Sequence, residues 1–407
     1  MTGTTVRWVG FLALAACAGE RATPPVAATI RDSAGITIVE NRMDTAAARA
    51  GWSISAAPTW AIGGLDVPDS QQLFRIGGAR RLADGRLAVI DGGAAELRIY
   101  DATRALVKTL GRKGEGPGEF TEPRLAGVVP GDSLIVYDGR LRRVSVLHPD
   151  GGFVRSYQVG TEGGGYPVAF GITSDGGVAI GGGMFFSSTE GFPRGAVRPN
   201  SRYVVLAPDG SVRGDFGEVP AAEMFARSSS NGMFSFTSLP FGRITAAASA
   251  PDLLWMGTGD AWELRAYAHD AALRRIVRFD RPQQPVTDAL RNAYLADLLE
   301  DAEDDNAARD LRDRFPDMPS PALVPPYQRL LVDALGSVWI GEYRLPGLDA
   351  TTYTVIDAEG RAVGRVSAPA HTLLLDIGAD YVLGVTLDEL DVERLTLWAL
   401  QRGASAQ

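Results

Sequence analysis

The stretch Gly111-Arg112-Lys113-Gly114-Glu115-Gly116-Pro117-Gly118-Glu119-Phe120 lies between two segments that share one pattern. Residues 86–100 precede it and residues 134–147 follow it, and each segment has the composition of two short strands. Four glycines and a proline in ten residues are incompatible with the interior of a helix or a strand ladder. The stretch is therefore predicted to be a shaped loop that joins two copies of a repeated β unit.

The repeated unit can be followed along most of the chain. It begins with a turn that contains Asp or Gly, continues as an apolar strand ending in Gly or Asp, and is followed by a second alternating strand. The copies lie at 83–91, 130–138, 174–181, 250–257, 334–341 and, more weakly, 377–384. Successive copies at Gly85, Asp132 and Gly176 are 47 and 44 residues apart, which is the length of a four-stranded propeller blade.

Six such units predict an all-β fold, a six-bladed β-propeller over residues 34–402, with a tail at 403–407. The last unit runs out of chain after three strands. A strand near the N-terminus is therefore expected to complete it and close the ring, and the segments 35–40 and 59–62 are the two candidates.

Two of the spacings between copies are longer, at 76 and 84 residues. The longer one predicts a helical insert at about 286–316, in which Thr287 can cap a first helix and Asp305 a second. Insertions in a propeller lie on its faces or rim, so we expect this one to cover part of a face.

Composition and charge narrow the class of protein. A chain of 407 residues with 45% hydrophobic residues can bury a large core and is not disordered. The formal net charge is −9 and the pI is about 5.1, whereas a nucleic-acid-binding protein is expected to carry a basic surface. We therefore expect no nucleic-acid partner.

The N-terminal residues predict an export signal. Arg7 precedes the apolar segment 8–16, which is too short to span a bilayer, and Leu14-Ala15-Ala16-Cys17 resembles a bacterial lipobox. The alternative is an ordinary secretory signal with a chance cysteine. The resemblance implies a signal peptide at 1–17, lipid attachment at Cys17 and a membrane-anchored envelope protein. Ala18, where Asp would signal inner-membrane retention, favours the outer membrane.

Two further expectations follow from this N-terminus. The segment 18–33, with Pro24 and Pro25, is expected to be a flexible tether. Cys17 is the only cysteine, so its lipidation would exclude disulfides and cysteine-based catalysis.

The run 114–120, followed by Pro123 and the strand-turn units, resembles the NHL-repeat and related bacterial six-bladed propeller families. The likeness is closest over about residues 74–158. It implies a ring with a central channel and ligand surfaces built from loops. It does not imply a reaction, because propellers serve as binding modules, scaffolds and enzymes alike.

The sequence predicts no catalytic residues, no metal site and no cofactor. Its three histidines, His148, His269 and His371, fall in different units and are interpreted as turn residues. The turn aspartates are explained by backbone hydrogen bonding, and the acidic run 300–305 lacks the spacing of a calcium loop.

A group of arginines is the feature of the sequence that points to a ligand site. One or two arginines lie shortly before the first turn of several units, where the innermost strand should run: Arg80, Arg81, Arg124, Arg243 and Arg329. Arginines at the mouth of a channel in an acidic protein would hold an anionic ligand. The alternative is that they pair with carboxylates of neighbouring blades.

The glycine-rich loop also has two interpretations, a backbone phosphate site or a blade connector with Phe120 inserted between blades. The second is favoured, because the loop lacks the Gly-Lys-Ser/Thr ending of a P-loop.

These observations predict a non-catalytic envelope lipoprotein that binds a small anionic ligand or an envelope protein on a propeller face. Apolar inserts around Phe185-Phe186, Met224-Phe225 and Met233-Phe234 would add contact area. The alternatives are a metal-dependent hydrolase or lyase acting in the channel, and an assembly scaffold with a large apolar patch on one face.

Overall fold

The computed structural model describes residues 28–42, 51–160, 167–182, 184–185, 194–228, 234–388 and 390–403. They form mainly antiparallel β-sheets that follow one another along the chain. The first sheet contains β5 (Ile76–Arg81), β6 (Leu87–Asp91), β7 (Glu96–Tyr100) and β8 (Leu106–Leu110). The second contains β9 (Pro123–Val129), β10 (Ser133–Asp138), β11 (Arg143–His148) and β12 (Gly152–Gln158).

The next sheets repeat this meander with longer connections. The third contains β13 (Val168–Ile172), β14 (Val178–Gly181), β17 (Asn200–Leu206) and β18 (Val212–Pro220), with the short β15 (Met184–Phe185) added. The fourth contains β21 (Ala246–Ser249), β22 (Leu253–Gly257), β23 (Glu263–Ala268) and β24 (Leu273–Asp280). The fifth contains β25 (Tyr327–Val332), β26 (Val338–Glu342), β27 (Thr352–Ile356) and β28 (Ala362–Ser367).

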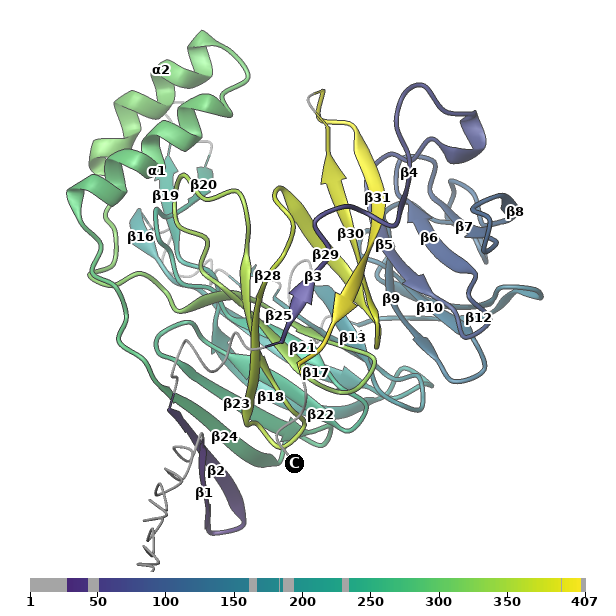
Figure 1. Cartoon of the computed structure of the whole chain (residues 1–407), viewed down its shortest axis with the longest axis horizontal. Coiled ribbons are helices and arrows are strands. Elements are labelled where there is room, and N and C mark those ends of the chain that lie inside the picture. The colour runs from purple at the N-terminus through teal and green to yellow at the C-terminus, as the bar shows by residue number, and fades with distance from the viewer. Residues whose placement is uncertain are drawn as a thin grey trace, which may run out of the picture.

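The final sheet joins both ends of the chain. It contains β29 (Thr372–Ile377), β30 (Tyr381–Leu387) and β31 (Glu393–Gln401), and its outer positions are filled by β3 (Ser53–Ile54) and β4 (Trp60–Ile62). Figure 1 shows β4 beside β31. Of the two N-terminal segments that the sequence offered for this position, 59–62 is therefore the one that pairs here.

The other N-terminal segment pairs elsewhere. Strands β1 (Ala28–Ser33) and β2 (Ile36–Arg42) form a hairpin, and β2 adds in parallel to the outer strand β24 of the fourth sheet. Residues 28–33 were expected in the tether, and the prediction is corrected here. The side chains from Thr29 to Ser33 are all exposed, while the backbone of β1 pairs with β2.

The sheets are arranged as a β-propeller. Their first strands lie next to one another: β5 contacts β9 and β29, β9 contacts β13, β13 contacts β21, and β21 contacts β25. The backbone N–H of Ala334, just after β25, donates to the carbonyl of Ile377 in β29 at 2.9 Å. The second strands, which carry the apolar motif of the repeat, are the most buried, and every residue of β6 and β26 is buried.

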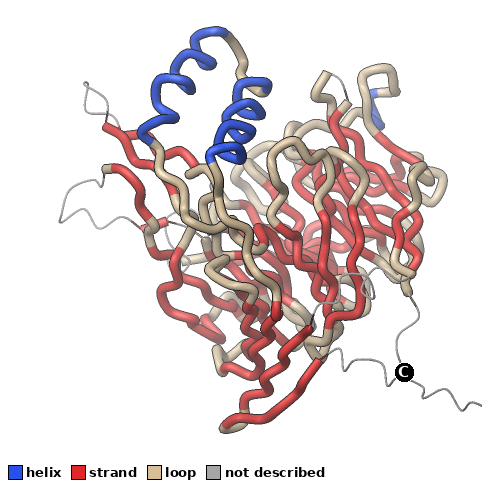
Figure 2. Tube along the Cα trace, turned by 60° about the vertical axis from the view of Figure 1, so that its left-hand side comes forward, coloured by secondary structure: helices blue, strands red, loops and turns tan. Residues whose placement is uncertain are grey.

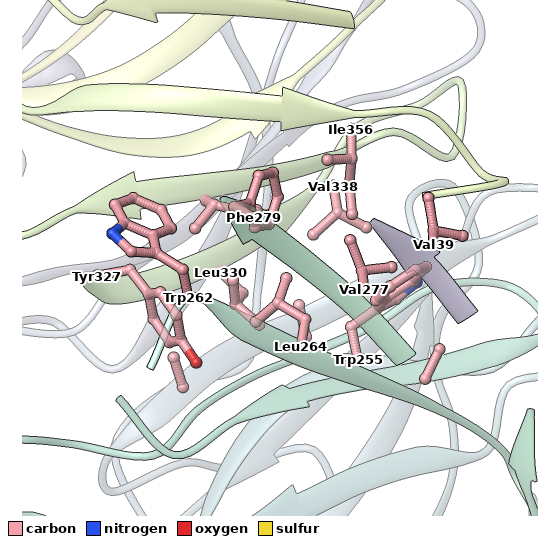
Figure 3. Packing of buried hydrophobic residues seen from close by; sticks show 14 of the residues in the cluster. Val39, Trp255, Trp262, Leu264, Val277, Phe279, Tyr327, Leu330, Val338 and Ile356 are labelled. Atoms are coloured by element: carbon pink, nitrogen blue, oxygen red, sulfur yellow. The ribbon is translucent and has the colours of Figure 1, made fainter. Parts of the chain in front are cut away.

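The core lies between the sheets, because both faces of each sheet are covered by its neighbours. Figure 3 shows the packing between the fourth and fifth sheets, where Val277 from β24 meets Val338 and Ile356 from the next sheet, beside Val39 from β2. All four side chains are buried. The N-terminal hairpin thus contributes to the core as well as to a sheet edge.

The chain segments that fill the two long spacings between repeats pack together on one face of the propeller. Helices α1 (Asp288–Glu300) and α2 (Asp305–Arg314) lie between β24 and β25, and Figure 2 shows them together at one end of the molecule. Thr287 caps α1 by accepting from the N–H of Leu290 at 3.3 Å. The cap of α2 is Asp304, one residue before the predicted Asp305, which instead begins the helix.

The helices pack on a small sheet from the other long spacing, formed by β16 (Gly195–Val197), β19 (Met224–Ser228) and β20 (Phe234–Ser238). Phe225 from β19 and Tyr294 from α1 pack against a cluster of Leu239, Phe315 and Met318. Phe225 is therefore partly buried inside this contact, whereas we had expected it to contribute to a ligand surface.

The glycine-rich loop is a connector between the first two sheets. Phe120 is fully buried in the cluster between them. Gly111 (φ 78°) and Gly118 (φ 74°) adopt left-handed conformations, and a Cβ on Gly111 would lie 2.3 Å from the Phe120 ring. The Glu119 carboxylate accepts from the N–H of Gly116 at 2.8 Å. A carboxylate of the same loop therefore already occupies an N–H group that a phosphate would need. This supports the interpretation of the loop as a connector between blades.

Candidate functional site

A cavity of about 410 Å³ occupies the centre of the ring. All of the first strands contribute to it: Gly77, Gly78 and Arg80 from β5, Arg124 to Ala126 from β9, Val168 to Gly171 from β13, Ala246 and Ala247 from β21, Gln328 to Leu331 from β25 and Leu375 from β29. None of the described residues that line it carries a carboxylate. Three arginines, Arg80, Arg124 and Arg329, therefore give the cavity a positive lining, in which Arg124 and Arg329 have no described carboxylate partner.

Arg329 is the deepest of the three. Its side chain makes no hydrogen bond or ion pair within the described ranges, and its Nη1 is buried without an acceptor. Burial lowers the pKa of Arg329, and the positive charge of Arg80 acts in the same direction. A guanidinium stays charged at neutral pH in spite of such a shift. Arg329 is thus a partly buried cation, with its Nη1 fully buried, that no described carboxylate contacts.

Arg80 and Arg124 differ in how they are held. Arg80 Nη1 donates to the carbonyl of Leu375, and its Nε lies 3.6 Å from Asp376 Oδ1, so its guanidinium is fixed against β29. Arg124 at the start of β9 is exposed, and no hydrogen bond of its side chain is found in the described part of the chain. The cavity therefore combines one fixed, one buried and one free guanidinium.

The other two predicted arginines lie outside this cavity. Arg81 stacks over the ring of Tyr381, 5.2 Å from its centroid, and lines a separate pocket between the first and last sheets. Arg243 precedes β21 and forms ion pairs with Glu223 and Asp260, the latter at 2.6 Å. The expectation that all five share one mouth is thus corrected: Arg243 has the structural role that was its alternative.

The rest of the lining is apolar or backbone. Phe170 and Tyr203 pack with their ring centroids 5.7 Å apart, and Leu125 and Leu375 add aliphatic surface. Gly77 allows β5 and β9 to approach, because a Cβ there would lie 2.5 Å from the Pro123 carbonyl oxygen. Sequence reasoning did not single out these residues, although the Gly77-Gly78 pair just before Arg80 was a visible signal of close backbone approach.

The histidines stay apart from this chemistry. The Nδ1 of His148 accepts from the N–H groups of Asp150 and Gly151 in its own turn. Burial lowers the pKa of His269. Across the described residues, no three His, Cys, Asp or Glu side chains gather as a group that could hold a metal ion.

Some predicted features lie outside the described residues, namely Cys17, Phe186 and Met233. Among the helices of the described ranges, none has the length and apolarity required to cross a bilayer.

Comparison with known proteins gives fold-level likeness only. No protein-family model and no curated protein matches the chain. Among solved structures, a Bacteroides fragilis protein assigned as exported is 12% identical, with 89% of this chain and 99% of that chain covered and a TM-score of 0.46. A gluconolactonase from Xanthomonas campestris is 14% identical, with 87% and 98% covered and a TM-score of 0.38.

A streptogramin B lyase is 12% identical, with 87% of this chain and 98% of that chain covered and a TM-score of 0.38. Likeness at this level says nothing about activity. The fold of this chain rests on its own strand pairings.

Proposed function

We propose that this protein is a non-catalytic envelope lipoprotein whose propeller binds a small anionic ligand in its central cavity. The observation that carries the proposal is the lining of that cavity, where Arg80, Arg124 and Arg329 meet without a carboxylate among the described lining residues. A ligand anion would supply the missing negative charge, and forked hydrogen bonds from guanidinium groups suit carboxylate or phosphate oxygens.

The proposal takes the six sheets as the six blades of a closed ring. Contacts between successive first strands support this, as does the pairing of β4 with β31, which joins the two ends of the chain. A closed ring holds its first strands at fixed distances, so the arginines would be positioned before a ligand arrives. Such preorganisation strengthens binding because little ordering remains to be done.

The apolar part of the lining refines the class of ligand. Phe170, Tyr203, Leu125 and Leu375 form surface that a fully hydrated inorganic ion would not use. We therefore propose an organic anion with a compact apolar body. The scaffold and metal-dependent enzyme alternatives gain no specific observation from the described residues.

The first test is anion-dependent stabilisation. The melting temperature of the full-length protein, purified in detergent, is followed during titration with citrate and with benzene-1,3,5-tricarboxylate at constant ionic strength. Binding to the folded state alone raises the melting temperature by mass action. We expect saturable increases, larger for the aromatic acid. Arg124→Gln should weaken them, because Arg124 is exposed and can be changed without disturbing the fold.

The matched control is Arg81→Gln, since Arg81 is an exposed arginine on the neighbouring first strand β5 but outside the cavity. It should leave the anion effect unchanged. Equal effects of Arg81→Gln and Arg124→Gln, or no saturable shift with either acid, would overturn the proposal. A saturable shift with calcium or zinc instead would support the metal-dependent alternative.

The lipoprotein part of the proposal is tested separately. Mass spectrometry of the protein produced in a bacterial host should show a chain that begins at a diacylated Cys17. Cys17→Ser should move the protein from the membrane fraction to the soluble fraction. An unmodified Cys17 in a membrane-associated protein would contradict this assignment.

A further inference from the structure

We propose that a second cavity, at the base of the two helices, binds a small carboxylate that carries an apolar group. This arm cavity has a volume of about 270 Å³. Its walls come from the two stems of the helical insert (281–284 and 324–326), from Trp262 and from loop 343–350 with its neighbouring strands. It shares no lining residue with the central cavity.

The floor of the arm cavity is a buried carboxylate whose hydrogen-bonding capacity is fully used. Glu342 Oε1 accepts from Arg365 Nε at 2.8 Å and from Thr354 Oγ1 at 2.8 Å. Its Oε2 accepts from Arg365 Nη2 at 2.9 Å and from Arg281 Nη2 at 2.9 Å. One carboxylate thus serves two guanidinium groups, and one positive charge remains uncompensated.

Arg281 carries the remaining charge. Its guanidinium lies over the ring of Trp262, 4.5 Å from the centroid, which fixes its plane. Its bond to Glu342 is the one side-chain hydrogen bond found for it in the described residues, and its Nη1 is buried without an acceptor. An arginine has five N–H donors in a planar fork, and a carboxylate is the anion whose two oxygens match that fork.

The remaining walls of the arm cavity indicate what kind of group the carboxylate ligand carries. Val324, Pro325, Leu345 and Leu348 form an apolar part of the wall, and Leu348 is 50% exposed at the rim. Arg344 also lines the cavity, and its Nη1 donates to the Leu348 carbonyl at 2.6 Å. The apolar part of the wall favours an aliphatic group over further charge. A volume of about 270 Å³ admits a group of the size of one amino-acid side chain with its carboxylate. N-acylated leucine has this chemistry.

The helices hold these walls in place. The N–H of Val324 donates to the carbonyl of Gln284 at 2.8 Å, which joins the two stems. The N–H of Gly347 donates to Asp297 Oδ2 of α1 at 3.1 Å, which fixes the loop that carries Leu345 and Leu348. The cavity is therefore bounded by segments that belong to one contact network rather than by independent loops.

Isothermal titration calorimetry on the full-length protein in detergent tests the proposal, with N-acetyl-leucine as the probe. We expect saturable binding of one equivalent. The uncharged N-acetyl-leucinamide, which has the same apolar group, should bind at least tenfold more weakly. Arg281→Gln should weaken N-acetyl-leucine binding at least tenfold, because it removes the free fork.

Two further variants separate this site from the fold and from the central cavity. Leu348→Trp fills the rim without touching Glu342, so it should block binding even if Arg281→Gln proves unstable. Because the central cavity is also proposed to take an organic anion, Arg124→Gln decides which cavity binds the probe: an unchanged affinity assigns the heat to the arm cavity, and a tenfold loss would overturn the inference. Absence of saturable heat, equal binding of the amide, or full binding by Leu348→Trp would also overturn it.

Discussion

The side-chain nitrogen of Asn41 donates a hydrogen bond of 2.9 Å to the carbonyl of Gly360, 319 positions further along the chain. Its side-chain oxygen accepts from the N–H of Ala362 at 2.8 Å. Asn41 lies on β2 and is only 1% exposed. One amide thus ties the N-terminal hairpin, which extends the fourth sheet, to a turn of the fifth.

Replacement of Asn41 by Ala should therefore lower the free energy of unfolding. The change removes the partner of the buried Gly360 carbonyl, which costs about 1 to 3 kcal/mol, and the partner of the partly buried Ala362 N–H, which adds to that cost. Urea unfolding followed by tryptophan fluorescence would measure it. Glu40→Ala is the control, because Glu40 is on the same strand in an exposed ion pair with Arg31 and should change stability by less than about 1 kcal/mol.

Acid should weaken the fold through Glu342. Its two arginine partners hold the pKa of this carboxyl at about 2, against 4.5 for an ordinary glutamate, although burial acts in the opposite direction. Because the folded pKa is depressed, the contribution is complete above about pH 5 and is lost as the pH falls toward 2. The size of the shift corresponds to roughly 3 kcal/mol.

Comparison with Glu342→Gln isolates that contribution. The variant should be less stable than the wild type at pH 7, since two buried guanidinium groups lose their counter-ion. The difference between the two proteins should shrink between pH 5 and pH 3. Asp310→Asn, at an exposed position on α2, should show no such convergence. A constant difference across this range would contradict the assignment.

The C-terminal end should stabilise the protein through one arginine. Arg402 Nη1 donates to Asp333 Oδ2 at 2.8 Å, and that carboxylate also accepts from Trp339 Nε1 at 2.9 Å. The Asp333 side chain is fully buried, so loss of Arg402 removes its charged partner. Deletion of residues 402–407 should lower the melting temperature by several degrees, whereas deletion of 404–407 should not change it. Equal melting temperatures for the two truncations would argue against this role.

Arg329 should show opposite effects on stability and on binding. A buried guanidinium without a described partner is unfavourable, so Arg329→Leu should raise the melting temperature of the ligand-free protein or leave it unchanged. The same variant should lose the stabilisation by benzene-1,3,5-tricarboxylate. A strongly destabilised Arg329→Leu protein would show instead that the arginine serves the fold.

Phe120 should be important for joining the first two sheets. It is fully buried, and truncation of such a side chain to Ala typically costs about 3 to 5 kcal/mol. Phe74→Ala is the control, because Phe74 is 67% exposed and its loss should cost under about 1 kcal/mol. Chemical denaturation of both variants gives the comparison.

The sequence predicts the second strands well and the first strands poorly, for a physical reason. Strand β6, Leu87–Asp91, is buried on both faces and follows an Asp-Gly turn, so both of its signals are local. Strand β5, by contrast, reads Ile-Gly-Gly-Ala-Arg-Arg. Its glycines are needed where backbones approach. Its arginines line two different pockets, Arg80 the central cavity and Arg81 the pocket that contains Tyr381. Neither feature resembles a typical strand.

The residues of the candidate sites also differ in how far the sequence alone could place them. Arg124 and Arg329 could be placed near the cavity by their position in the repeat. Arg243 could not be excluded in this way, because its partners Glu223 and Asp260 lie in other segments that only the fold brings to it. The sequence did contain a signal for Glu342 of the arm cavity. Glu342 is the last residue of the second strand of its sheet, and the buried Asp91 and Asp138 occupy the same position in theirs.

The pairing of β4 with β31 has a consequence for how the chain is made. In the last sheet the early strands β3 and β4 pair with β31, which is translated after every other strand that the structure describes, so this sheet cannot be completed until the chain has been translated through β31. Until then β4 has no partner and the ring stays open, with apolar strand edges available to other chains. A ribosome that stops early would release a product prone to aggregation, and we expect that the cell must hold the nascent chain until its final strand arrives.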